Sequence, residues 1–122
     1  MQKTHHEMRE AKVASIWIGT FESESDFDWY FSETFQSDVG FDIYWPAGPE
    51  GGYKHNIADI RTLLERASLS NRFIDEAVEK STAKNITSAN SSLVFLHLAY
   101  DESQMEKSMP MTFLGPIRFT EG

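Results

Sequence analysis

The sequence contains no cysteine in its 122 residues. This absence excludes disulfide bonds, thiol catalysis and thiolate metal ligands, and it suits a reducing compartment. Long apolar runs are missing too, since no stretch approaches the ~20 residues of a membrane-spanning helix. The amino-terminal residues 1–12 are polar and lack the apolar segment of a signal peptide. We therefore expect a protein that stays in the cytoplasm and contacts no membrane.

Basic residues are absent from one long stretch. The 41 residues between Lys12 and Lys54, here called the acidic segment, hold eight acids and eleven of the sixteen aromatic residues. The eight acids equal the formal net charge of −8, so the rest of the chain is balanced. A disordered acidic tail has few aromatics because it buries nothing. The pattern therefore favours a folded acidic face that meets a basic partner through aromatic anchors. The competing interpretation is that most rings are core residues and the acids only increase solubility.

This acidic balance also argues against direct binding of nucleic acid or anionic lipid through phosphate groups. It leaves open a partner protein that is itself basic and binds nucleic acid. The charge pattern thus points to protein–protein recognition rather than to DNA or RNA contact.

The order of apolar patterns predicts one α+β domain over residues 1–122, with a flexible start at 1–11. We expect a single sheet of about four strands, largely antiparallel at its carboxyl end and covered on one side by two to three helices. Residues 46–52 are predicted to form a loop, and Asn56 to cap a helix. The strand over 111–119 is predicted to pair with 93–100, and either to lie at an edge or to be kinked at Gly115-Pro116, because Pro116 has no N–H to donate. The predicted elements are strands at 13–19, 41–45, 93–100 and 111–119, and helices at 24–35, 56–67 and 70–84.

The helix over 24–35 has two distinct faces. Ser23 is its expected cap, and the acids that follow suit the positive end of the helix dipole. Trp29 falls opposite the apolar face and is flanked by Asp26 and Glu33, so the core does not obviously need it. The predicted core-facing residues are Phe27, Tyr30, Phe31 and Thr34, with Phe35 at their edge.

The search for chemistry is largely negative. Acids two residues apart on a helix diverge and cannot share a metal ion, and the sequence has neither a phosphate-binding glycine loop nor a nucleophile elbow. His97 sits within an apolar strand and is expected to be a buried, neutral, hydrogen-bonded side chain. We predict no cofactor, no metal site and no enzymatic activity. One enzymatic alternative stays open, a hydrolase-like cleft lined by Asp38, Asp42 and His97.

Several ordered segments together resemble a known family. The first is Val13-Ala-Ser-Ile-Trp-Ile-Gly-Thr-Phe21 with Ser23, Glu24, Phe27 and Tyr30 after it; the others are residues 73–77, 86–90, 93–101 and 112–115. In order and spacing they are similar to the immunity protein 22 family of bacterial polymorphic toxin systems. The resemblance implies a non-enzymatic inhibitor that binds and neutralises a cognate toxin domain. Toxins of such systems are often nucleases with basic active sites.

The resemblance implies a toxin as the partner, and the charge and aromatic pattern of the acidic segment gives the candidate partner-binding residues. The first group is Trp29 with Asp26 and Glu33 on the outer helix face. The second is Asp42, Tyr44 and Trp45, which lead into the predicted glycine–proline loop. Trp17 is a weaker candidate because core packing explains it. A third hypothesis, an acidic mimic of nucleic acid, differs by binding several basic proteins instead of one.

Overall fold

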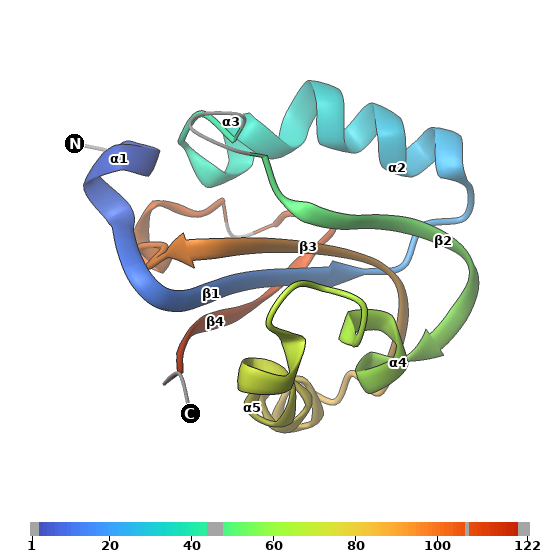
Figure 1. Cartoon of the computed structure of the whole chain (residues 1–122). Coiled ribbons are helices and arrows are strands. Elements are labelled where there is room, and N and C mark those ends of the chain that lie inside the picture. Colours follow the sequence, from blue (N-terminus) through green and yellow to red (C-terminus); the bar gives the residue numbers. More distant parts are fainter. Residues whose placement is uncertain (1–2, 44–47, 107, 120–122) are drawn as a thin grey trace.

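The computed structural model describes residues 3–43, 48–106 and 108–119. Four strands form one antiparallel sheet in the order β2-β3-β1-β4 (Figure 1). This arrangement confirms the predicted α+β class with a single sheet of about four strands. The strands are β1 (Arg9–Gly19), β2 (Glu50–Asp59), β3 (Ser88–Leu98) and β4 (Thr112–Arg118).

Strand β1 lies in the middle of the sheet and is buried on both faces. Ile16 and Ile18 enter one core while Trp17 enters the other, as the alternation of side chains along a strand requires. The predicted pairing of 93–100 with 111–119 is wrong, because β1 lies between β3 and β4 and pairs with both. Strand β4 does lie at an edge, as Pro116 predicts.

Helices cover both faces of this sheet (Figure 1), so the prediction of cover on one side is wrong. The physical reason is that β1 and β3 are apolar on both faces, and each face must be shielded from water. One face carries α1 (His5–Met8), α2 (Glu24–Tyr30), the π-helix η1 (Phe31–Phe35) and α3 (Gln36–Val39); the other carries α4 (Ile60–Leu64) and α5 (Ser70–Ala83). A short 3-10 helix, η2 (Glu102–Gln104), follows β3.

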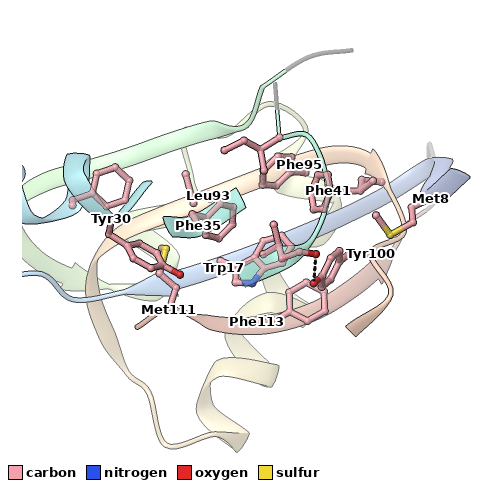
Figure 2. Packing of buried hydrophobic residues seen from close by; sticks show 14 residues of the cluster. Met8, Trp17, Tyr30, Phe35, Phe41, Leu93, Phe95, Tyr100, Met111 and Phe113 are labelled. Atoms are coloured by element: carbon pink, nitrogen blue, oxygen red, sulfur yellow. Dashed lines mark hydrogen bonds between the residues drawn. The ribbon is translucent and has the colours of Figure 1, made fainter. Parts of the chain in front are cut away.

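Trp17 is the centre of the aromatic core beneath α2 and α3 (Figure 2). It is completely buried, and its ring lies 4.9 Å from that of Tyr100 and 4.5 Å from that of Phe113, measured between centroids. Phe35 and Phe95 meet it edge to face at 5.4 and 5.6 Å. Such geometries add to the burial energy of each ring. Trp17 is therefore a core residue.

The helix predicted over 24–35 forms, but it extends to Val39 and contains the π-helical turn η1. A π turn holds more residues than an α turn and rotates the residues that follow it. Phe35 is consequently fully buried, whereas Phe31 and Thr34 are only half-buried. The prediction that placed Phe35 at the edge of the apolar face is therefore wrong.

Strand β2 occupies the region for which we predicted a loop and a helix cap. Glu50, Gly51 and Gly52 pair with β3, and Asn56 lies inside the strand, so both predictions are wrong there. The strand bulges strongly, since Tyr53 pairs with Ser91 and Ala58 with Ala89 while four residues of β2 face a single residue of β3. The helix begins only at Ile60.

The turn that follows α3 replaces a predicted strand. Gly40 ends α3 in the left-handed conformation with φ 77°, and the described residues 41–43 form a bend and a turn. The predicted strand over 41–45 is therefore wrong in this part, while Tyr44 and Trp45 lie outside the described residues. Phe41 and Ile43 still enter the core, which explains the alternation that indicated a strand.

Regular structure also occurs within the start of the chain, where a flexible segment was expected at 1–11. Helix α1 begins with a capping box, in which the Thr4 hydroxyl accepts from the Glu7 N–H and the Glu7 carboxylate accepts from the Thr4 N–H. Met8 is buried in the aromatic core, and β1 starts directly afterwards at Arg9. The two hydrogen bonds and the Met8 contact explain why this polar segment contains a helix.

Candidate partner-binding surface

Trp29 lies on the outer side of α2, as the helical spacing predicts. Its side chain is 64% exposed, whereas Phe27 and Tyr30 on the inner side of the same helix are buried. The helix begins at Ser23, whose hydroxyl accepts a 3.2 Å hydrogen bond from the Asp26 N–H. Trp29 is therefore the large ring of this helix that the core does not use.

Acidic residues lie before and after Trp29 along the helical segment. Asp26 and Glu33, the two predicted neighbours of Trp29, are exposed on the helical segment. Three further exposed acids of the acidic segment lie on or just before α2, and together the five form the acidic helix surface. They are Glu22, Glu24, Asp26, Asp28 and Glu33.

Only one residue of the second predicted group, Asp42, lies within the described residues. Asp42 is exposed in the turn after α3. Tyr44 and Trp45 lie outside the described residues, so their predicted contacts remain predictions. Among the described rings of the acidic segment, Trp29 is exposed, and the others are buried or half-buried. The core interpretation thus accounts for most of the aromatic residues, but not for Trp29.

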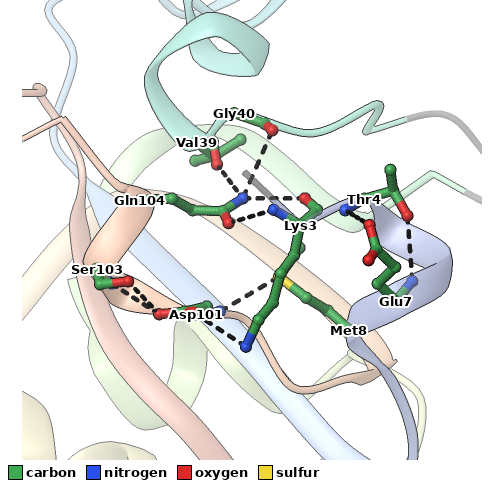
Figure 3. A network of polar contacts seen from close by, with 9 residues as sticks. All are labelled: Lys3, Thr4, Glu7, Met8, Val39, Gly40, Asp101, Ser103 and Gln104. Atoms are coloured by element: carbon green, nitrogen blue, oxygen red, sulfur yellow. Dashed lines mark hydrogen bonds and ion pairs between the residues drawn. The ribbon is translucent and has the colours of Figure 1, made fainter. Parts of the chain in front are cut away.

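The position of the acidic helix surface is fixed by hydrogen bonds at the carboxyl end of the helical segment (Figure 3). The Gln104 amide donates to the carbonyl oxygens of Val39 and Lys3 at 3.2 Å. Lys3 in turn forms a 3.1 Å ion pair with Asp101. Hydrogen bonds from Ser103 and Lys3 lower the pKa of Asp101 to about 2. These contacts join the end of α3 to both the amino terminus and the segment after β3.

The residues of the enzymatic alternative do not form one site. His97 is exposed rather than buried, and its Nδ1 accepts a 3.1 Å hydrogen bond from the Lys12 N–H. Both residues have positive φ, at an irregularity of the β1–β3 pairing that turns His97 out of the apolar strand. His97 lines a hollow of about 260 Å³ whose described lining includes neither Asp38 nor Asp42.

Asp38, one of the two acids of that alternative, contacts a tyrosine on the helical segment. Asp38 accepts a 2.8 Å hydrogen bond from the Tyr30 hydroxyl, and burial together with this carboxylate raises the pKa of Tyr30. In the described part of the chain, no group of three His, Asp or Glu side chains is placed to hold a metal ion.

Sequence reasoning missed a groove beside the acidic helix surface. The groove lies between α2 and β2 and is lined by Glu24, Phe27, Asp28 and Tyr53 among others. It was not predicted because β2 itself was not predicted. The one available signal was the pair of acids Glu24 and Asp28, which are spaced one helical turn apart.

Comparison with known proteins connects this surface to a family. The model of the family described as Immunity protein 22 matches residues 14–120. Neither the curated proteins nor the solved structures contain a match to the chain. Across the residues that the structure describes, no helix combines the length and apolar character needed to cross a membrane.

Proposed function

The chain belongs to the Immunity protein 22 family, and on this premise we propose that it binds and neutralises one cognate bacterial toxin domain through its acidic helix surface. Membership of an immunity protein family implies an inhibitor rather than an enzyme, and a toxin protein as the partner. The finer parts of the proposal are the binding face and the class of toxin.

The observation that carries the binding face is the exposure of Trp29 between Asp26 and Glu33. Large aromatic side chains in the centre of an interface supply much of the binding energy, while a polar rim excludes water. Trp29 is 64% exposed and has acids on either side along the helix. It is thus available as an anchor without any change in the fold. Asp42, Tyr44 and Trp45 complete the proposed contacts.

The proposed class of toxin follows from charge. A nuclease holds a phosphate backbone with basic residues, and carboxylates can occupy the positions that phosphates would take. The acidic segment has eight acids and no Lys or Arg, so it attracts such a surface at long range. This attraction raises association rates by about 10- to 10³-fold at low salt. We propose a basic, nuclease-type toxin that is neutralised in the cytoplasm of the producing cell.

The test is co-expression with the toxin domain encoded beside this chain, scored as bacterial growth. Rescue of growth together with a complex that co-purifies is the expected result. The complex should weaken between low salt and about 0.5 M salt, since exposed charges are screened within a few ångströms at high ionic strength. No rescue and no complex would contradict the proposal, and retention of several unrelated basic proteins would favour the mimic hypothesis.

A further inference from the structure

The groove between α2 and β2 lies beside the acidic helix surface and is lined by both rings and carboxylates. Its volume is about 480 Å³, within the range of protein pockets that hold small ligands. Strand β2 forms the edge of the sheet, and its Gly52 leaves open space where a Cβ atom would stand. The groove is therefore accessible to a side chain of a partner.

Aromatic rings line one part of this groove. The rings of Phe27 and Phe31 are stacked with centroids 6.0 Å apart and an interplanar angle of 5°. Tyr53 approaches Phe27 from β2 at 6.4 Å. Phe31 and Tyr53 are half-buried, so parts of both side chains remain accessible. Such a surface favours a flat or weakly hydrated group over a compact, strongly hydrated one.

Two carboxylates stand at the helix side of the groove. Glu24 and Asp28 lie one turn apart on α2, and both are exposed. Neither forms an ion pair with any residue of the described ranges. Glu24 lies in the first turn of α2, where the helix dipole favours negative charge, and Asp28 follows one turn later. They leave a negative potential beside the rings.

We propose that this groove receives an arginine side chain of the toxin, an inference that rests on the proposed function. A guanidinium group is planar and stacks on aromatic faces, and its N–H donors match carboxylates in pairs. Tyr53 supplies a partly accessible ring, and Glu24 and Asp28 supply the acceptors. A lysine ammonium is compact and more strongly hydrated, so the same groove suits it less well.

This groove and Trp29 lie on different flanks of one helix. Trp29 points outward, whereas Glu24 and Asp28 border the side next to β2. A toxin that uses both would hold α2 from two directions. The ring then anchors the interface, and the groove selects a toxin with an arginine at the matching position.

The first experiment tests the groove without the toxin. The isotopically labelled protein is titrated with capped Gly-Arg-Gly, Gly-Lys-Gly and Gly-citrulline-Gly peptides and followed by NMR. The arginine peptide should shift the amide signals of Glu24, Asp28, Gly52 and Tyr53, and the neutral citrulline peptide should not. Equal shifts with the lysine or citrulline peptide, or no shifts at these residues, would overturn the proposal.

The second experiment uses the toxin domain encoded beside this chain and matched double variants. E24Q/D28N removes the two groove charges. The control E65Q/E79Q removes two exposed charges near α4 and on α5, on the other face of the sheet. The groove variant should raise Kd about 30-fold or more, and the control less than about 3-fold. Melting curves of both variants verify that they are folded.

The outcomes separate this inference from the proposed function. A wild-type complex with equal Kd changes in the two variants means that only net charge matters, and the groove proposal fails while the immunity function stands. Failure of the wild-type protein to bind the toxin or rescue growth contradicts the function, and the groove proposal falls with it.

Discussion

The hydroxyl group of Tyr30 donates a 2.8 Å hydrogen bond to the carboxylate of Asp38, across the π-helical turn between α2 and α3. This bond joins the two α-helical parts of the segment that carries Trp29. Tyr30→Phe keeps the ring in the core but removes the donor. We expect it to lower the free energy of unfolding by about 1 kcal/mol, measured by urea denaturation.

The control for this variant is Tyr53→Phe. No hydrogen bond joins the Tyr53 hydroxyl to another described residue, so its removal should change stability by less than about 0.5 kcal/mol. Equal effects of the two substitutions would show that the Tyr30–Asp38 bond contributes nothing specific.

Trp29→Ala separates binding from folding. Because the ring is largely exposed, the melting temperature should change by only a few degrees. Binding to the toxin should weaken by about 2 kcal/mol or more, as measured by calorimetry. The core control is Phe35→Ala, which removes a fully buried ring and should cost about 3–5 kcal/mol of stability. A strongly destabilised Trp29→Ala variant would instead assign this ring to the core.

Gly51 and Gly52 form a matched pair in β2. Both have positive φ, at 106° and 135°, so alanine at either position is strained by about 1–3 kcal/mol. At Gly51 an added Cβ would also lie 2.4 Å from the Ser92 carbonyl oxygen, but at Gly52 it would meet nothing within 4 Å. Gly51→Ala should therefore be the more destabilising by roughly 1–3 kcal/mol in thermal or urea unfolding. Equal effects would mean that β2 can move away from β3 freely.

Asp101 makes stability depend on acid pH. Hydrogen bonds from Ser103 and Lys3 lower its pKa in the folded protein to about 2, below the value of about 3.9 in an unfolded chain. Its stabilising effect is thus fully present above about pH 4 and is lost as the pH falls through about 2. Asp101→Asn should flatten the pH dependence of the urea midpoint between pH 4 and 2. Parallel curves for the two proteins would refute this assignment.

The sequence predicts the outer position of Trp29 well because the periodicity of α2 is local. The Ser23 cap and the buried pair Phe27 and Tyr30 follow from the same pattern. Phe35 could not be placed, since a π turn changes the rotation per residue and has no sequence signature that we could use. The error in the predicted helix face therefore falls at the π-helical turn, whose last residue is Phe35.

Strand β2 and His97 show a second limit of prediction from the sequence. Pairing between strands that are far apart in the chain leaves no local pattern. Ile57, Ile60, Leu63 and Leu64 have helical spacing, but pairing with β3 holds residues 50–59 as a strand and leaves Ile57 59% exposed. His97 has apolar neighbours, yet the irregular pairing of β3 with β1 turns it toward solvent. Each outcome depends on a strand far away in the chain.

The strand order has a consequence for how soon this protein can act after synthesis. Strand β1 pairs with β3 and β4, and β2 pairs with β3, so no described strand pair can form before residue 88 has been made. Sheets built from such distant pairs fold slowly compared with helical proteins. A ribosome must therefore complete most of the chain before the first copy is folded.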